Sequence, residues 1–122
     1  MVIHGDVSFL WNGDLIEITS TGPFNEFGLS HSISEIKSAI LNKKIKSWRR
    51  MEIWDDETLG SPECVMLSIE KAKWFIAHGC YASAIVVSNS LQKALIEKVA
   101  TGNVHFFDEV ATARKWLDEQ ST

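Results

Sequence analysis

The first part of the chain alternates between apolar and polar side chains, which is the two-residue period of β-strands. The alternating apolar positions are Val7, Phe9, Trp11, Ile16 and Ile18. Asn12-Gly13 lies between the two runs and is a strong short signal of a hairpin in which both turn residues need positive φ. We therefore predict a β-hairpin whose second strand ends before Pro23, because proline cannot donate to a strand ladder.

Four later segments follow the 3.6-residue period of amphipathic helices. The predicted inward positions are Leu29, Ile33, Ile36 and Ile40 in a first helix near 26–43, Val65, Ile69, Ala72 and Ile76 in a second, Leu91, Leu95 and Val99 in a third, and Val110, Ala113 and Leu117 in a fourth. Short polar side chains accept hydrogen bonds from free helix amides. The predicted N-caps of the last three helices are Ser61, Asn89 or Ser90, and Asp108.

Three segments between the helices have the composition of strands. They are residues 47–54, 81–88 and 104–107. One face of the first segment carries both apolar and charged side chains, namely Trp48, Arg50, Glu52 and Trp54. This mixed face predicts a strand that is only partly covered on that side. The second segment, YASAIVVS, is apolar on both faces, which is typical of a central strand.

The predicted order of elements is ββαβαβαβα. A helix between successive strands requires parallel neighbours and a right-handed crossover, whereas the hairpin adds an antiparallel pair. A chain of 122 residues suits one domain. We predict a single α/β domain over residues 1–122, with a mixed sheet, the hairpin at one edge and residues 81–88 in the interior.

Composition and charge exclude several classes of protein. The hydrophobic fraction is 45% and the charged fraction 23%, which is typical of a globular domain. A net charge of −4 argues against general nucleic-acid binding, although residues 43–50 form one short basic run. The apolar runs are too short for a transmembrane segment, and the first residues lack the pattern of a secretory signal. We expect a cytoplasmic protein in which Cys64 and Cys80 are buried thiols.

The end of the chain carries a family resemblance. VHFFDEVATARKWLDEQ resembles the closing strand and helix of the STAS domain, in its SpoIIAA-like branch, and ASAIVVSNSLQKAL looks like the preceding strand-helix unit. The matching positions of the closing segment are Phe107, Asp108, Ala113, Trp116 and Leu117. The order of elements agrees with that family over nearly the whole chain. The resemblance implies a SpoIIAA-like fold and a non-catalytic, regulatory role of the bacterial type.

The resemblance also implies a phosphorylation switch. In anti-sigma-factor antagonists, a serine or threonine that begins the helix after the third strand is phosphorylated by a partner kinase, which ends binding. Here that place holds DDETLGSPE, without the family's usual aspartate-serine-(serine or threonine)-glycine run. Ser61 and Thr58 are therefore the candidate phosphoacceptors. Four carboxylates nearby oppose a phosphate, so the simpler prediction is that Ser61 only caps the helix.

The same segment has another interpretation. Asp55, Asp56 and Glu57 could supply oxygen ligands to a divalent cation, but three adjacent acids diverge and the alternating acids of a calcium loop are missing. We predict no metal and no cofactor. The sequence also lacks a nucleophile elbow, a metalloprotease motif and a phosphate-binding loop, which argues against an enzyme.

Two non-catalytic functions remain open. The leading prediction is a regulatory or protein-protein interaction domain. The alternative is an apolar-ligand or lipid-binding module, because the SpoIIAA-like branch is similar in fold to Sec14-type lipid-carrying domains and the chain is rich in aromatic residues. An uncharacterised small enzyme ranks third. The hairpin, with Phe9, Trp11 and Phe24, also predicts association into a homodimer through an exposed strand edge or an aromatic face.

Overall fold

The elements of the structure follow the chain in the predicted order. The structure, a computed structural model, describes residues 2–58 and 61–122. The elements are β1 (Asp6–Asn12), β2 (Leu15–Thr21), α1 (Glu26–Lys43), β3 (Trp48–Trp54), α2 (Pro62–Ala77), β4 (Cys80–Val86), α3 (Ser90–Glu97), β5 (Val104–Phe107) and α4 (Val110–Asp118). The predicted α/β class and the order ββαβαβαβα are confirmed.

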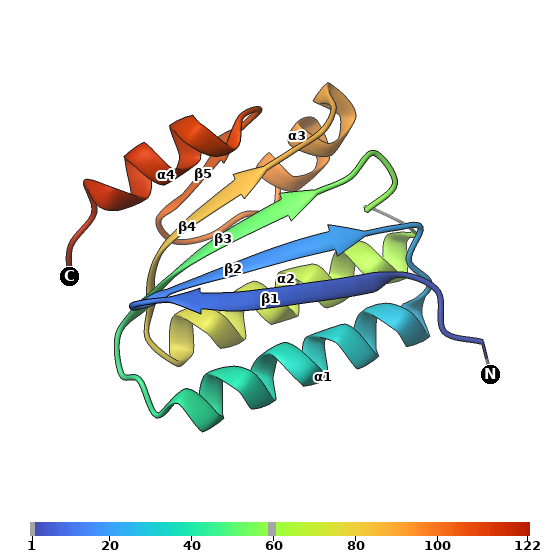
Figure 1. The fold of residues 1–122 in the computed structure, drawn as a ribbon. Coiled ribbons are helices and arrows are strands. Elements are labelled where there is room, and N and C mark those ends of the chain that lie inside the picture. Colours follow the sequence, from blue (N-terminus) through green and yellow to red (C-terminus); the bar gives the residue numbers. More distant parts are fainter. Residues whose placement is uncertain (1, 59–60) are drawn as a thin grey trace.

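A five-stranded mixed sheet forms the centre of the molecule, in the order β1-β2-β3-β4-β5 (Figure 1). β1 is antiparallel to β2, and all other neighbours are parallel. The hairpin therefore lies at one edge, and β4 lies between β3 and β5. Ile85 in β4 is 4% exposed and Val87 just after it is 7% exposed, which confirms the interior position predicted for this segment.

Three helices cover one face of the sheet and one helix covers the other. Ile36 of α1 and Phe75 of α2 share a buried cluster with Ile16 of β2, and Ile96 of α3 packs with Ile85 on the same face. α4 lies on the opposite side of the sheet from α1 and α2 (Figure 1). The core on that side of the sheet comprises Leu15, Met51, Ala82, Ala84, Val86, Ala113 and Leu117.

The predicted partial exposure of β3 is wrong. Trp48, Arg50, Glu52 and Trp54 are 0%, 3%, 1% and 4% exposed. Arg50 and Glu52 are buried because they pair with each other and Glu52 also pairs with Lys71 of α2. Pairing of this kind is what allows charged side chains to leave water. The mixed face therefore lies in the core.

The predicted inward stripe is correct for the isoleucines of α1 and only partly correct for α2 and α3, in which Val65, Ile69, Ala72 and Val99 are partly buried. In α1 the three isoleucines Ile33, Ile36 and Ile40 are buried, as predicted. In α2 the predicted Ile76 is 44% exposed, and the buried residues are Cys64, Lys71 and Phe75. In α3 the predicted Leu91 and Leu95 are 67% and 40% exposed, and the buried residues are Gln92 and Ile96. A polar side chain takes an inward position in each of these two helices because it has a partner there.

The ends of the elements follow the predictions in part. Ser61 and Asn89 cap α2 and α3, each accepting a hydrogen bond from a backbone amide three residues later. Asp108 does not cap α4, whose N-cap is Glu109 without a side-chain hydrogen bond. The hairpin turn is Gly13-Asp14 rather than Asn12-Gly13, since Asn12 pairs with Leu15 and only Gly13 in this turn has positive φ.

Other sequence predictions concern exposure. Cys64 and Cys80 are free and buried, as predicted. Phe24, which we expected to contribute to an association surface, is only 7% exposed and belongs to the core. Within residues 2–58 and 61–122, no helix has both the length and the apolar composition needed to cross a bilayer.

Candidate functional site

The candidate site begins at the loop after β3, where the carboxyl ends of the parallel strands meet. In open α/β sheets, ligands and partners commonly bind at this edge. Asp55 organises the loop: its carboxylate accepts hydrogen bonds from the backbone N–H of Gly22 at 3.1 Å and of Glu57 at 3.1 Å. Burial would raise the pKa of Asp55, but the Gly22 hydrogen bond and the Thr58 hydroxyl lower it overall. Asp55 is thus an ionised structural anchor.

Thr58, one candidate phosphoacceptor, is part of this anchor. Its hydroxyl lies 2.8 Å from Oδ1 of Asp55 and 3.2 Å from the carbonyl oxygen of Ser20, and it accepts the backbone N–H of Asp55 at 3.1 Å. A phosphoryl group would break these contacts and place its charge against the Asp55 carboxylate. The geometry therefore disfavours Thr58 as a phosphoacceptor.

Ser61, the other candidate, lies at the start of α2 and is exposed. Its hydroxyl oxygen accepts the backbone N–H of Cys64 at 3.4 Å. The α2 N-terminus would favour a phosphate on Ser61, whereas the neighbouring Glu63 carboxylate would oppose it. Leu59 and Gly60 separate the two candidates and lie outside the described residues.

The loop between β4 and α3 braces the acidic loop from the side. Nε2 of Gln92 donates to the carbonyl oxygen of Asp55 at 2.6 Å, and Nδ2 of Asn89 donates to that of Asp56 at 3.4 Å. The Asn89 side chain also caps α3 by accepting the backbone N–H of Gln92 at 2.9 Å. These contacts explain why Gln92 is buried. They fix the two loops to each other, a feature that the sequence analysis missed.

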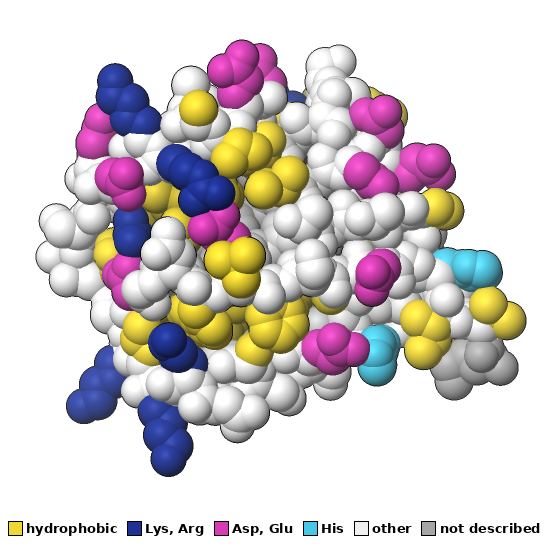
Figure 2. Space-filling model, in the orientation of Figure 1, with side chains coloured by type: hydrophobic (Ala, Val, Ile, Leu, Met, Phe, Trp, Pro, Cys, Tyr) yellow, Lys and Arg dark blue, Asp and Glu magenta, His cyan; other side chains and the backbone are white. Residues whose placement is uncertain are grey.

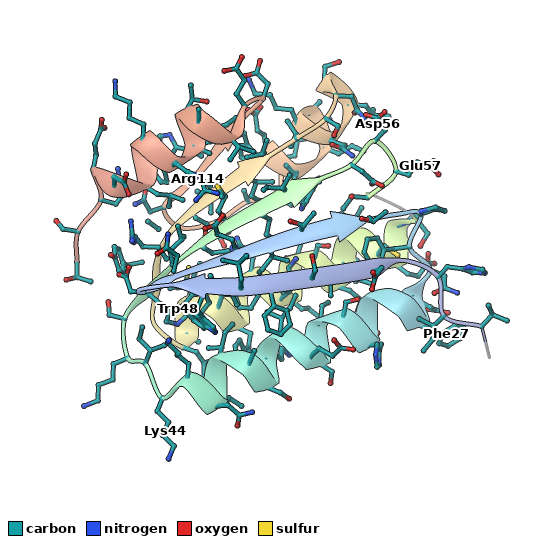
Figure 3. All side chains as sticks on the ribbon, viewed as in Figure 1. Phe27, Lys44, Trp48, Asp56, Glu57 and Arg114 are labelled. Carbon is teal, nitrogen blue, oxygen red and sulfur yellow. The ribbon has the colours of Figure 1, made fainter. Side chains whose placement is uncertain are left out.

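Charge and exposure give this end of the molecule a distinct surface. Asp56 and Glu57 are exposed and lie at the end of the molecule opposite Lys44 (Figure 3). Met66, in the second turn of α2, is 63% exposed, and Leu91, at the start of α3, is 67% exposed. In the view of Figure 2, the basic side chains lie mostly toward the other end of the molecule, whereas acidic side chains occur at both ends. We call Asp56, Glu57, Ser61, Met66 and Leu91 the carboxyl-end surface.

The three acids of the loop do not converge on one point. Asp55 points back to Gly22 and Thr58 through its hydrogen bonds, whereas Asp56 and Glu57 are exposed. Among residues 2–58 and 61–122, no three histidine, cysteine or acidic side chains are grouped as metal ligands would be. The acidic loop therefore contributes surface charge to this end of the molecule.

A second polar cluster is buried beneath α2. Nη1 of Arg50 donates to Oε2 of Glu52 at 2.5 Å, and Nζ of Lys71 donates to Oε1 at 3.0 Å. The indole N–H of Trp54 also donates to Glu52, at 3.1 Å, and Nε of Arg50 donates to the Ser83 hydroxyl at 3.0 Å. Two cations thus share a single carboxylate in the core. We call Arg50, Glu52 and Lys71 the buried triad.

Burial and pairing act in opposite directions on the pKa values of the triad. Burial raises the pKa of Glu52, but the charges of Lys71 and Arg50 outweigh it and lower the pKa to about 2. Burial lowers the pKa of Lys71, and its ion pair with Glu52 only partly offsets this. The period-two pattern of β3 placed Arg50 and Glu52 on one face, but it held no information on Lys71, whose partner lies 19 residues away.

Two narrow cavities lie on either side of the triad. One is between α1 and α2, bordered by Phe24, Ile33 and Lys71, and the other is between α2 and α3, bordered by Ile69, Lys71 and Ile96. As they stand, each has room for only about one or two water molecules. The aromatic residues around Trp48 and Phe75 pack edge to face and fill the remaining core.

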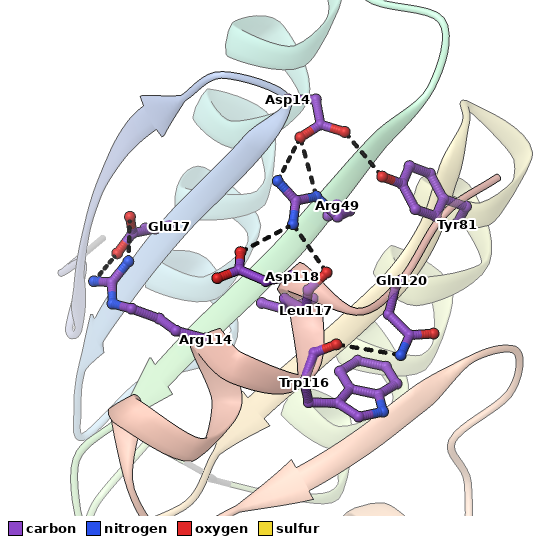
Figure 4. Close-up of polar contacts among 9 residues, drawn as sticks. All are labelled: Asp14, Glu17, Arg49, Tyr81, Arg114, Trp116, Leu117, Asp118 and Gln120. Atoms are coloured by element: carbon purple, nitrogen blue, oxygen red, sulfur yellow. Dashed lines mark hydrogen bonds and ion pairs between the residues drawn. The ribbon is translucent and has the colours of Figure 1, made fainter.

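A third polar group lies at the opposite end of the parallel strands, beside the hairpin turn (Figure 4). Asp14 accepts hydrogen bonds from Nη2 of Arg49 at 2.6 Å and from the Tyr81 hydroxyl at 2.9 Å. Arg49 also donates to the carbonyl oxygen of Leu117 at 2.9 Å. Arg49 of β3 thereby connects the hairpin turn to the end of α4. We therefore assign this group to holding α4 on the sheet.

Comparison with solved structures identifies the fold. No family model matches the chain, and no curated protein matches it in sequence. An uncharacterised protein of the DUF3478 family with a SpoIIAA-like fold, from Shewanella loihica PV-4, is similar over 96% of both chains, with a TM-score of 0.66 and 14% identity. The protein TM1081 is similar over 92% of this chain and 88% of its own, with a TM-score of 0.67 and 13% identity. The chain has the SpoIIAA-like fold.

Proposed function

We propose that the chain is a non-catalytic interaction domain that binds a protein partner through the carboxyl-end surface. The observation that supports this most strongly is that hydrogen bonds from Asn89 and Gln92 hold the acidic loop after β3 against the loop before α3. A surface that is held before binding loses less conformational freedom when a partner docks. The proposal implies a regulatory role in the cytoplasm.

The chemistry of the surface defines the partner. Asp56 and Glu57 favour a basic segment, and exposed Met66 and Leu91 favour apolar side chains beside it. Methionine adapts its shape to a partner and is frequent at such surfaces. We therefore propose a partner that presents lysine or arginine next to leucine, isoleucine or an aromatic residue.

The narrow cavities argue against a carrier of large apolar ligands. A lipid-binding domain needs an enclosed space of several hundred Å³, whereas the cavities beside the buried triad admit only water-sized molecules as they stand. An enzymatic function has less support, because the buried triad lies under α2. Among the described residues of the carboxyl-end surface, the one hydroxyl, that of Ser61, accepts a backbone N–H as a helix cap. The interaction domain is therefore the function that we favour.

Site-specific crosslinking in the native cells tests the proposal. A photoreactive amino acid is introduced at Asp56 or at Leu91, with Asn42 on α1 as an exposed control at the other end of the molecule. We expect a discrete crosslinked protein from the first two positions but not from Asn42. Changing Glu57 to glutamine should weaken the crosslink from Leu91, and added salt should weaken it further because the pairing is electrostatic.

Two outcomes would contradict the interaction domain. One is an absence of discrete crosslinks from Asp56 and Leu91 when the proteins fold normally. The other is the same set of crosslinks from Asn42, which would indicate contact without a specific surface. Circular dichroism of each purified variant establishes that its fold is retained.

A further inference from the structure

The end of the molecule opposite the carboxyl-end surface is basic. Two segments supply this charge: residues 41–48, which end α1 and lead into β3, and residues 71–78, at the end of α2. Together they contain Lys43, Lys44, Lys46, Lys71 and Lys73 but neither aspartate nor glutamate. Lys71 belongs to the buried triad, and the other lysines are exposed. The basic run of the sequence therefore forms surface charge at this end.

The two basic segments belong to one continuous surface. The backbone N–H of Trp48 donates to the carbonyl oxygen of Gly79 at 3.0 Å, and the indole N–H of Trp48 donates to that of His78 at 2.8 Å. These bonds hold the loop after α1 against the end of α2. In addition, Nζ of Lys37 on α1 lies 5.3 Å from the ring centroid of Trp74 on α2. Basic side chains project from this end of the molecule in Figure 2.

Exposed apolar side chains lie among these lysines. Leu41 near the end of α1 is 59% exposed, and Ile76 near the end of α2 is 44% exposed. Lys37 precedes Leu41 by one helical turn, and Lys73 precedes Ile76 by one turn, so each apolar side chain shares a helix face with a lysine. We call Leu41, Lys43, Lys44, Lys46, Lys73 and Ile76 the basic end.

We propose that the basic end docks the domain on an anionic membrane surface. Each lysine close to such a surface increases the affinity by about fivefold. Leu41 and Ile76 enter the boundary between the head groups and the acyl chains, where apolar side chains add to electrostatic binding. The carboxyl-end surface would then point away from the bilayer, although neither proposal depends on the other.

Two other kinds of partner fit the basic end less well. A single-stranded nucleic acid needs free aromatic rings on which its bases stack. The ring of Trp74 already has Lys37 over it and His78 stacked on it, with ring centroids 3.8 Å apart. Protein interfaces are enriched in arginine and depleted in lysine, whereas the nearby Arg49 and Arg50 are engaged within the fold. Exposed lysines beside aliphatic side chains favour the membrane.

Flotation of the whole chain with lipid vesicles tests the proposal. Vesicles of phosphatidylcholine with phosphatidylglycerol are compared with vesicles of phosphatidylcholine alone. We expect the chain to float only with the anionic vesicles and to dissociate as salt is added. Lys44→Gln should weaken binding about fivefold, and the combined change of Lys43, Lys44 and Lys46 to glutamine about a hundredfold. Lys93→Gln, which removes an exposed lysine near the start of α3, changes the net charge equally and should leave binding unchanged.

A second pair of variants tests the apolar contribution. Leu41→Gln should weaken binding by about fivefold or more, because less apolar surface enters the bilayer. This loss should persist at high salt, whereas the loss caused by Lys44→Gln should shrink. Asn42→Gln, at the neighbouring exposed position, is the control and should have no effect. Circular dichroism establishes that each variant keeps its fold.

Four results would overturn the membrane proposal. The first is a chain that does not float with anionic vesicles, and the second is equal flotation with phosphatidylcholine alone. The third is equal weakening by Lys44→Gln and Lys93→Gln, which would mean that only the overall charge matters. The fourth is binding of a single-stranded oligonucleotide through Lys44 without any binding of vesicles, which would assign the basic end to nucleic acid. None of these results bears on crosslinking from Asp56 or Leu91, so the two proposals fail independently.

Discussion

Nη1 of Arg49 donates to the carbonyl oxygen of Leu117 at 2.9 Å, across 68 residues of sequence. The same guanidinium is held from the other side by Asp14 of the hairpin turn, through Nε at 3.0 Å and Nη2 at 2.6 Å. One side chain of β3 thus joins the hairpin turn to the C-terminal end of α4 (Figure 4). α4 is the only helix on its face of the sheet among the described elements, so this bridge adds to the packing of Ala113 and Leu117 in holding the cover of that face.

Replacing Arg49 with lysine should loosen α4. An ammonium cannot reproduce the fork that contacts Asp14 and Leu117 together, and charge-assisted hydrogen bonds contribute about 1.5–3 kcal/mol each. We expect the free energy of unfolding to fall by about 1–3 kcal/mol and hydrogen exchange to quicken in α4 more than in α1. Arg114→Lys is the control, because the Arg114 side chain is 44% exposed and its pair with Glu17 should contribute less than about 1 kcal/mol. Equal exchange in α1 and α4 after Arg49→Lys would contradict the bridge.

Replacing Glu52 with glutamine should destabilise the core strongly. The change leaves Arg50 and Lys71 buried without a carboxylate, and breaking a buried pair in this way costs about 3–5 kcal/mol. Urea unfolding measures the loss. Glu70→Gln, at an exposed position one residue before Lys71 on α2, is the matched control and should change stability by no more than about 0.5 kcal/mol. A small effect of Glu52→Gln would mean that the triad is not an ion cluster.

The same carboxylate predicts the response to acid. The pKa of Glu52 is about 2 in the folded chain against an ordinary value of 4.5. Because the folded value is the lower one, the stabilisation is complete above about pH 4.5 and is lost as the pH falls toward 2. We expect the unaltered chain to lose about 3 kcal/mol of unfolding free energy from this group over that window. Glu52→Gln should lack that part of the pH dependence, which urea titrations across the window would measure.

Ser61→Ala should cost about 1 kcal/mol of stability, because the amide of Cys64 loses its acceptor. Ser30→Ala, at an exposed position inside α1, is the control and should be neutral or slightly stabilising, since alanine favours helices. The partner crosslink from Leu91 should survive Ser61→Ala if the serine only caps the helix. A mass spectrum of the native protein with stoichiometric phosphate on Ser61 or Thr58 would overturn this ranking and support a phosphorylation switch.

The exposed edge at β1 should make the chain a homodimer. An unpaired strand edge offers free backbone donors and acceptors to a second copy, and Leu10 on β1 is 58% exposed. We expect sedimentation to show a dimer and Leu10→Lys to weaken it by about tenfold or more, because two charges would meet across the edge. Leu41→Lys, on α1 and 59% exposed, should leave the dimer unchanged. A monomer at high protein concentration would contradict the prediction.

The sequence predicted the fold better than the site because local periodicity records the order of elements directly. Ile33, Ile36 and Ile40 lie inward at helical spacing, and they are buried as predicted. The inward face of α2 was misjudged because Lys71 is buried by a partner on β3, and no pattern within α2 signals that partner. The same holds for Gln92, whose partner is a backbone carbonyl in another loop.

The candidate site depended on contacts of this distant kind. Asp55 stood out in the sequence as one of three adjacent acids, but its role comes from the Gly22 amide, 33 residues earlier. Ser61 was predicted correctly as a cap because its partner amide is only three residues away. Local chemistry was therefore readable, whereas the buried triad and the bracing of the two loops required the fold.

Among the described elements, α4 alone covers the second face of the sheet, and this has a consequence while the chain is being synthesised. Ribosomes release a chain from its amino end, so β1 to β5 emerge before α4 does. Until then, the surface that α4 covers, including Leu15, Met51 and Ala84, has no helix over it. A nascent or truncated chain that ends before Val110 would present this apolar patch to chaperones and proteases. The patch is covered only when α4 has left the ribosome and packs on the sheet.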